Sequence, residues 1–441
     1  MKYIGIRQAG PSVTLSQAVL NSTPMGGGLY MPQRLPVIPA PFFMNFGGMR
    51  FDEISYFLAN QLFGQDVESA ALKRVVDEAF NFEVPLVQLS ENIYAIELFH
   101  GPTLTFKDFG ARFMARLLGH LHTGAEMQRS KRSGKLHVLI ATNGNTGSAV
   151  ANGFAGISNV EVYILFPRGH AGRQQELQFT TLGGNIHALE VQGTIDDCHS
   201  LVSQAFADPA LNAVAVLTSA NSANIARLLP QSFYYFYAMA ALSEKIGSKS
   251  PVTIAVPSGN LGNVCAGVAA ADMGLKYNKL VACENANSFL TDMLAGRDNA
   301  APRAIPTLAC AADKGRPSNI DRLRYLCGGD VDGMRGRISA VSYDDAAIIN
   351  AVNGCYDATG YTIDPHGAMA WKALNDSLKP GETGLIMATG HPAKSLTAMS
   401  AITGRAMDLP LQLTRFMNGI DHRRPIMPMY PALRDIILNN L

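Results

Sequence analysis

The sequence has 441 residues and an almost balanced charge, with 36 Lys+Arg against 35 Asp+Glu and a formal net charge of +1 at pH 7. Hydrophobic residues make up 47% of the chain, and no stretch approaches the roughly 20 apolar residues that a membrane helix needs. No dense basic run with interleaved aromatic residues is present, which argues against a nucleic-acid partner. The first residues turn polar before a signal-peptide core develops, so we expect a cytoplasmic protein.

The length and the cysteine pattern limit the architecture. A chain of 441 residues exceeds what one ordinary core accommodates, so we expect two or three packed units. The 6 cysteines are scattered without a close pair, which argues against a disulfide framework and against a zinc site.

Residues 1–90 are expected to form a separate N-terminal unit of mixed α+β structure. Clusters of Pro and Gly at 24–28 and 32–41 are followed by helical periodicity over 51–80.

Beyond this unit, short apolar runs alternate with amphipathic segments such as 148–156 and 195–207. The runs rich in Val, Leu and Ile predict buried strands over 136–141, 160–166, 186–191, 214–217, 252–256, 280–283 and 384–388. Strand, loop and helix in repetition predict an α/β fold of parallel sheets covered by helices, divided into domains 91–240 and 241–441. Ligands of such sheets bind beyond the carboxyl ends of the strands, so the loops after these runs are the candidate sites.

The loop after strand 252–256 has a phosphate-binding pattern. It reads PSGNLGN over residues 257–263 and leads into a helix of small residues, 264–273. This arrangement points backbone N–H groups and the positive helix end at an anion. Gly259 and Gly262 permit close approach, and the Ser and Asn side chains of the loop can donate hydrogen bonds. A tight turn without a ligand is the alternative.

A second glycine loop, Thr142–Ala149, follows strand 136–141. It lacks the full dinucleotide-binding glycine spacing, and no lysine follows it as in a nucleotide triphosphate loop. An ordinary turn is again the alternative.

Lys107 stands beside Phe106 and close to Phe109 at the expected start of a helix. The positive end of the helix dipole and desolvation by the aromatic rings should both lower the pKa of this lysine, which suits a Schiff-base amine. An exposed lysine that merely begins a helix is the alternative. The string Asp-Phe-Gly over 108–110 also occurs in protein kinases, but the sequence has no His-Arg-Asp catalytic loop upstream, which argues against a kinase.

Strand 384–388 ends at Thr389. A hydroxyl at that strand end can contact a neutral ring nitrogen. A threonine that caps the next helix fits equally well.

Together these segments resemble threonine synthases, which belong to the tryptophan-synthase-like fold type II of pyridoxal-phosphate enzymes. The resemblance runs along nearly the whole chain. It rests on segments in family order: GGLYMP, ELFHGPTLTFKDFGARF, ATNGNTGSA, FPRG, TLGGNI, LTSANSANIARLLPQ, PSGNLGN, DPHGA and ATGHPAK.

The resemblance implies that Lys107 carries pyridoxal 5'-phosphate as a Schiff base. It implies that Asn145 lies beside the phenolic oxygen of the cofactor and that Thr389 faces the pyridine nitrogen. The implied phosphate loop comprises Ser258, Gly259, Asn260, Leu261, Gly262 and Asn263.

The family's amino-acid-binding region implies a set of substrate contacts: Thr142, Asn143, Thr146, Ser148, Asn221, Asn224 and Arg227. Arg227 is a reasonable partner for a substrate phosphate, with a surface salt bridge as the alternative. His100, Asp108, Arg112 and Lys394 lie in matching segments without an assigned role.

The activity implied by the resemblance is the conversion of O-phospho-L-homoserine and water to L-threonine and phosphate, by γ-elimination and β-addition in a monomer or homodimer. Another fold type II lyase, such as a phospho-lyase or a serine or threonine dehydratase, is the nearest alternative, and the N-terminal unit argues against it. A non-catalytic relative would have no use for Lys107, Asn145 and Thr389. A nucleotide-dependent oxidoreductase is a further alternative, and the sequence argues against it because it lacks the full glycine fingerprint of a dinucleotide-binding loop.

Overall fold

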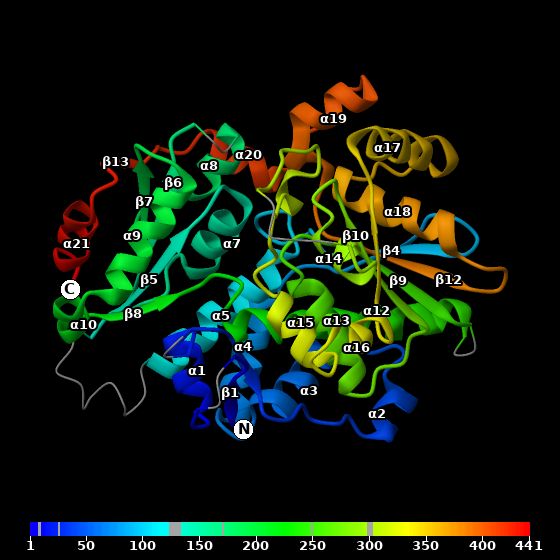
Figure 1. Cartoon of the computed structure of the whole chain (residues 1–441), viewed down its shortest axis with the longest axis horizontal. Coiled ribbons are helices and arrows are strands. Elements are labelled where there is room, and N and C mark those ends of the chain that lie inside the picture. Colours follow the sequence, from blue (N-terminus) through cyan, green and yellow to red (C-terminus); the bar gives the residue numbers. More distant parts are fainter. Residues whose placement is uncertain (8–9, 25–26, 123–133, 170–171, 248–249, 298–302) are drawn as a thin grey trace.

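Two sheets of mainly parallel strands organise the chain, with helices packed around them (Figure 1). The computed structural model describes residues 1–441 except 8–9, 25–26, 123–133, 170–171, 248–249 and 298–302. Among the described helices, none has both the length and the apolar character needed to cross a membrane.

The larger sheet has 6 strands in the order β11-β10-β9-β12-β4-β3 and lies on the right in Figure 1. Every pair is parallel except β3 and β4, which form an antiparallel hairpin. Its strands are β3 (Leu86–Gln88), β4 (Ile93–Glu97), β9 (Val252–Pro257), β10 (Lys279–Glu284), β11 (Ser339–Ser342) and β12 (Thr383–Ala388).

The smaller sheet has 5 strands in the order β13-β7-β6-β5-β8, all parallel, and lies on the left in Figure 1. Its strands are β5 (Leu136–Ala141), β6 (Val160–Pro167), β7 (Ile186–Val191), β8 (Val216–Ser219) and β13 (Arg424–Ile426). The helices around it are α7 (Asn145–Phe154), α8 (Arg173–Thr180), α9 (Ile195–Ala207), α10 (Pro209–Val214), α20 (Leu411–Met417) and α21 (Tyr430–Leu438).

Most of the other helices belong to the side of the larger sheet. α18 (Pro365–Ser377) packs across β9, β12 and β10, and α12 (Gln231–Ile246) packs on α13 (Gly262–Asp272). The rest are α11 (Ile225–Leu228), α14 (Phe289–Leu294), η1 (Cys310–Ala312), α15 (Ile320–Leu326), α16 (Val331–Arg335), α17 (Asp345–Thr359), η2 (Pro392–Ser395) and α19 (Leu396–Thr403).

The N-terminal segment forms mixed α+β structure, as predicted. An antiparallel pair, β1 (Tyr3–Gly5) and β2 (Tyr30–Pro32), is accompanied by α1 (Leu15–Asn21), α2 (Ala40–Asn45), α3 (Phe51–Phe63) and α4 (Ser69–Ala79). The predicted periodicity over 51–80 is divided between α3 and α4 by a turn that begins at Gly64. α4 packs on α5 (Lys107–His122) and α3 on α12, so the N-terminal core is continuous with that of the larger unit.

The predicted strands agree with β5, β6, β7, β9, β10 and β12 within one residue at each end. The prediction over 214–217 is displaced, because Val214 ends α10 and β8 begins at Val216. The Asp208 carboxylate accepts hydrogen bonds from the N–H groups of Ala210 and Leu211, which caps α10 and extends helical structure into the apolar run.

The two sheets do not follow the predicted boundaries near residues 90 and 240. β4 lies in the predicted domain 91–240, yet it pairs with β12, with Ile93 opposite Gly384. β13 lies in the predicted domain 241–441, yet it pairs with β7 in the smaller sheet. Each sheet is therefore assembled from stretches that are far apart in the chain, which local sequence patterns do not encode.

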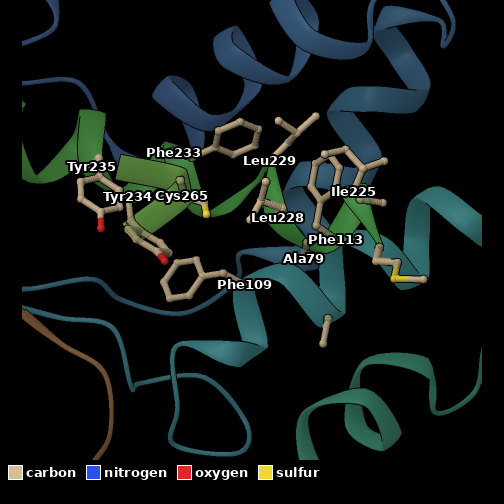
Figure 2. Packing of buried hydrophobic residues seen from close by; sticks show 14 of the residues in the cluster. Ala79, Phe109, Phe113, Ile225, Leu228, Leu229, Phe233, Tyr234, Tyr235 and Cys265 are labelled. Atoms are coloured by element: carbon tan, nitrogen blue, oxygen red, sulfur yellow. The ribbon is translucent and has the colours of Figure 1, made fainter. Parts of the chain in front are cut away.

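An aromatic cluster fixes the start of α5 against α12 (Figure 2). The rings of Phe109 and Tyr234 meet edge to face at 5.2 Å, and those of Phe113 and Phe233 at 5.9 Å. These geometries are favourable for aromatic pairs. Because Lys107 begins α5, the cluster also fixes the backbone that carries this lysine.

A buried arginine joins three segments of the chain. Arg322 on α15 is 0% exposed. Its Nη2 donates to the carbonyl oxygens of Tyr30 (3.0 Å) and Ala223 (2.9 Å), and its Nη1 donates to Ser222 O (3.3 Å) and Asn319 Oδ1 (2.5 Å). These contacts connect β2, the loop before α11 and α15.

Candidate active site

A cavity of about 590 Å³ lies where loops from the carboxyl ends of strands in both sheets meet. Loops after β5, β9 and β12 contribute to its wall, as does the segment from Ala304 to Lys314. Most of the predicted site residues line it: Lys107, Thr142, Asn143, Asn145, Thr146, Arg227, Ser258, Gly259, Asn260, Leu261, Gly262, Asn263 and Thr389.

The loop before Lys107 is held against the end of β12. The N–H of Phe106 donates to the carbonyl oxygen of Thr389 at 3.0 Å, and the Thr105 hydroxyl donates to the same oxygen at 3.3 Å. The buried Asp108 carboxylate accepts hydrogen bonds from the N–H and the hydroxyl of Thr103 at 2.8 and 2.7 Å. These contacts place Lys107 and Thr389 on the same wall of the cavity.

The environment of Lys107 makes its ammonium easier to deprotonate than that of an ordinary lysine. Burial lowers the pKa of Lys107 to about 8, and the positive charges of Lys314 and Arg227 act in the same direction. The lysine lines the cavity instead of projecting from the outer surface. The alternative of an exposed lysine that merely begins a helix is therefore wrong.

The loop after β9 has an unusual backbone. Leu261 is the N-cap of α13 and has a φ of 59°, in the left-handed region that costs a residue with a side chain about 1 to 2 kcal/mol. A Cβ on Gly259 would lie 2.7 Å from Cα of Ala312, so only glycine permits this close packing against η1. The first residues of α13, Gly262 to Val264, line the cavity, and the first N–H groups of a helix have no partner within the helix.

Asn263 offers a free donor at the start of α13. Its Oδ1 accepts hydrogen bonds from both Tyr234 and Tyr235, each at 2.8 Å (Figure 2 shows the two phenols). Its buried Nδ2 has no hydrogen-bond partner among the described residues. Because two hydroxyl donors fix the orientation of the amide, the N–H₂ group remains for a ligand.

Two other side chains of this loop already make contacts. The Ser258 hydroxyl donates to Val256 O at 2.8 Å. Asn260 Oδ1 accepts from the N–H of Ser318 at 3.2 Å, which leaves its amide nitrogen as the donor. The loop therefore presents mainly N–H donors to the cavity, as an anion requires.

Asn145 and Thr389 present polar groups to the same cavity. Oδ1 of Asn145, at the start of α7, is buried without a partner among the described residues. Thr389 is 7% exposed, and its hydroxyl makes no hydrogen bond within the described part of the chain. His391 accepts from the N–H of Ala393 and so caps η2, which means that the alternative role of Thr389 as a helix cap is wrong.

Thr142 shapes the loop after β5. Its hydroxyl accepts hydrogen bonds from the N–H groups of Gly144 (3.1 Å) and Gly147 (3.0 Å). Asn143 and Thr146 line the cavity beside it, at the N-terminal end of α7.

Three predicted substrate contacts do not line the cavity: Ser148, Asn221 and Asn224. Ser148 is 0% exposed and donates to Gly144 O and Gln175 O. Asn224 is 0% exposed and caps α11. Asn221 accepts from the N–H of Ala223 at 2.8 Å. These three side chains were predicted to contact the substrate. In the structure they instead form hydrogen bonds with backbone groups of the chain.

Arg227 is buried in the cavity wall. It is 3% exposed, so the alternative of a surface salt bridge is wrong. Its Nη1 donates to Ala220 O at 2.8 Å, and its buried Nε has no partner among the described residues. Burial lowers the pKa of Arg227 to about 10. A cation in this setting is a candidate contact for an anion.

Further polar residues line the cavity that were not predicted as site residues: Gln175, Gln231, Cys310, Asp313, Lys314, Asp364, His366 and Lys394. Asp364, His366 and Lys394 lie in the segments DPHGA and ATGHPAK, so their motifs could have indicated them. Lys314 lies in no recognised motif, and only the fold brings it beside Lys107.

Comparisons with known proteins agree with this arrangement. Residues 2–80 match the family model described as threonine synthase N terminus, and residues 82–390 match that of pyridoxal-phosphate dependent enzymes. A threonine synthase of Escherichia coli is 35% identical over 100% of both chains, and one of Haemophilus influenzae is 38% identical over 94% of both.

A solved structure, a PLP-bound threonine synthase of Brucella melitensis, superposes with a TM-score of 0.90 at 28% identity, covering 100% of this chain and 99% of that one. The similarity therefore includes the N-terminal unit, both sheets and the loops that form the cavity. The chain belongs to the threonine synthase family of fold type II pyridoxal-phosphate enzymes.

Proposed function

We propose that the chain converts O-phospho-L-homoserine and water to L-threonine and inorganic phosphate. The observation that carries this proposal is the position of Lys107, a lysine of lowered pKa, in one cavity with an N–H-rich loop and further cations. The activity requires a cofactor, an amine base and two sites for phosphate groups, and the cavity offers residues for each requirement.

The residues of the cavity fit pyridoxal 5'-phosphate. The loop after β9 and the unpartnered Nδ2 of Asn263 suit its phosphate, the hydroxyl of Thr389 suits its pyridine nitrogen, and Asn145 suits its phenolic oxygen. Lys107 supplies the amine that would hold its aldehyde carbon. When bound, the cofactor delocalises the negative charge that develops on the substrate carbons.

The side chains of the cavity would transfer protons and bind the substrate. The Lys107 amine accepts the α proton of the substrate and moves protons at the β carbon. The N–H groups at the start of α7, in the loop 142–146, hold the substrate carboxylate, and Arg227 contacts its phosphate. The enclosing loops exclude bulk water, so that the water that adds at the β carbon enters in a controlled position.

Full-length similarity to threonine synthases disfavours the alternative of a dehydratase or phospho-lyase. The experiment that separates these activities is an assay of purified protein with O-phospho-L-homoserine, in which phosphate and threonine are both measured. We expect equal amounts of the two products. Phosphate without threonine would assign the protein to the phospho-lyases instead. A cytoplasmic location and a monomeric or homodimeric state stay predictions.

The lowered pKa of Lys107 predicts how cofactor attachment depends on pH. Because the neutral amine is the nucleophile and its pKa is about 8, attachment to cofactor-free protein should accelerate about tenfold per pH unit below pH 8 and then level off. The rate of change in visible absorbance after addition of pyridoxal phosphate measures this. A rate that still rises tenfold per unit above about pH 9 would instead indicate an ordinary lysine.

A further inference from the structure

A second cavity, of about 440 Å³, lies beside the segment that follows Thr389. Its walls come from the end of β4 and the residues after it, from α17 and the turn that follows, and from segments at the start of η2 and at the end of α19. No residue lines both this cavity and the one that contains Lys107. Its volume is in the range of small-molecule sites, yet the proposed conversion gives it no role.

Much of the wall of the second cavity is apolar or aromatic. Phe99 is 5% exposed, and its ring stacks on that of His100 at 5.0 Å and meets that of His391 edge to face at 5.4 Å. The apolar and aromatic side chains that line the cavity are those of Phe99, Val352, Tyr356, Tyr361, Pro392 and Met407. A ligand of this cavity should therefore have an apolar body.

Arg405 presents unused donors to the second cavity. Its Cζ lies 3.6 Å from the centroid of the Tyr356 ring, a cation–π contact that holds the guanidinium plane against the ring. Its backbone N–H donates to Thr403 Oγ1 at 3.3 Å, but within the described part of the chain the guanidinium makes no hydrogen bond or ion pair. A planar fork held in this way suits a carboxylate, which can accept two hydrogen bonds from it.

His391 supplies a further donor. Its Nδ1 accepts a hydrogen bond from the N–H of Ala393 at 3.1 Å. Burial lowers the pKa of His391, and the charge of His100 acts in the same direction, so the ring is neutral at pH 7 and carries its proton on Nε2. Among the described residues, this N–H group has no partner.

The carboxylate of Glu97 gives the second cavity a fixed negative charge. Its Oε1 accepts from the Tyr361 hydroxyl at 2.7 Å and its Oε2 from His100 Nε2 at 2.6 Å, while its side chain is 12% exposed. Within the described residues, no Lys or Arg forms an ion pair with Glu97, and the same holds for Asp408, an exposed carboxylate on the cavity wall. The fixed oxygens of Glu97 keep lone pairs for a cationic donor.

We propose that the second cavity binds a free α-amino acid with an apolar side chain. Its carboxylate would pair with the Arg405 guanidinium and the N–H of His391, its ammonium with the carboxylate of Glu97, and its side chain would lie against the aromatic wall. A simple carboxylic acid or a simple amine would leave one of the two charged walls without a partner. A phosphate ester suits the site less well, because one guanidinium faces two carboxylates there.

The second cavity adjoins the wall of the catalytic cavity without opening into the same set of residues. Glu97 pairs with Ala388, the residue before Thr389. His391 follows Thr389 by two residues. A bound amino acid would therefore contact both strand ends that support this wall, although it would not compete with the substrate.

The direct test is calorimetric titration of the cofactor-loaded protein with L-phenylalanine, L-leucine and L-methionine. An α-amino acid can also displace the amine of Lys107 from the cofactor, so the protein is first treated with borohydride, which closes that route. We expect at least one of the three to bind with a dissociation constant of about 1 mM or lower. If none of them binds at about 10 mM, the proposal is wrong.

Analogues of the amino acid that binds most tightly test the two charged contacts. The analogue without the amino group and the analogue without the carboxylate should each bind at least about tenfold more weakly, because each loses a charge-assisted hydrogen bond. Equal affinity for either analogue would contradict recognition of a zwitterion.

Variants of the protein place the bound amino acid. Arg405→Met and Glu97→Gln should each weaken binding by about 10- to 100-fold. Arg405 is exposed and its guanidinium makes no hydrogen bond among the described residues, so this variant should fold normally. Arg335→Met, which replaces an exposed arginine outside the cavity, is the matched control and should bind like the unmodified protein.

Unchanged affinity in Arg405→Met would mean that the amino acid binds elsewhere, for example in the catalytic cavity, and would overturn the proposal. The titration requires no turnover. Its outcome is therefore independent of whether the protein forms threonine from O-phospho-L-homoserine.

Discussion

Replacing Lys107 by alanine should reduce the rate of threonine formation by at least about 10⁴-fold, the scale on which loss of a group that forms the covalent link acts. The same variant should lose the cofactor signal that borohydride fixes to the protein. In the unmodified protein, borohydride treatment followed by peptide mass spectrometry should find the reduced cofactor on Lys107.

The control for this variant is its stability. The ammonium of Lys107 makes no hydrogen bond within the described residues, and burial disfavours its charge, so alanine should leave the unfolding midpoint nearly unchanged. If the variant is folded but inactive, the loss of activity is due to the missing amine and not to unfolding. Retention of activity within tenfold of the unmodified protein would show that another amine carries the cofactor.

Replacing Arg322 by alanine should lower the free energy of unfolding by about 3 to 5 kcal/mol. The guanidinium is 0% exposed, and its loss leaves acceptors on β2, on the loop before α11 and on α15 without donors. Urea denaturation, followed by circular dichroism, measures the change. We expect the N-terminal segment to become sensitive to protease first, because its Tyr30 carbonyl loses this contact.

Arg335→Ala is the matched control. Arg335 forms an ion pair with Asp332 at 2.6 Å, but its side chain is 45% exposed. Exposed pairs of this kind contribute about 0 to 1 kcal/mol. Similar destabilisation by the two variants would mean that burial of Arg322 does not decide its contribution.

Local sequence patterns predicted the buried strands well, because a buried strand requires a continuous run of apolar residues. The strands β5, β6, β7, β9, β10 and β12 are buried and apolar, and their bounds were predicted within one residue. The short strands β3, β11 and β13 lie at or beside sheet edges, where burial is less complete, and no pattern indicated them. Pairing between distant strands, such as β4 with β12, is a property of the whole fold.

Residues that line the cavity were predicted from the sequence where their motif determines both the course of the backbone and the direction of the side chain. The residues of the loop after β9 and Lys107 are of this kind. Ser148 and Asn224 lie in equally good motifs, but a motif does not say toward which side of its helix a residue points. Lys314 could not be predicted, because contacts between segments far apart in the chain bring its segment to the cavity, among them the packing of Ala312 on Gly259 and the hydrogen bond from Ala311 N–H to His366 Nε2.

The interleaved order of the strands has a consequence for synthesis on the ribosome. β4 emerges long before β12, so the edge of β4 that later pairs with β12 stays unpaired while most of the chain is translated, although its other edge can pair with β3. β13 emerges near the very end, and until then β7 remains an uncovered edge. Uncovered strand edges promote association between nascent chains. The protein should therefore depend on chaperones until its last few dozen residues have been released.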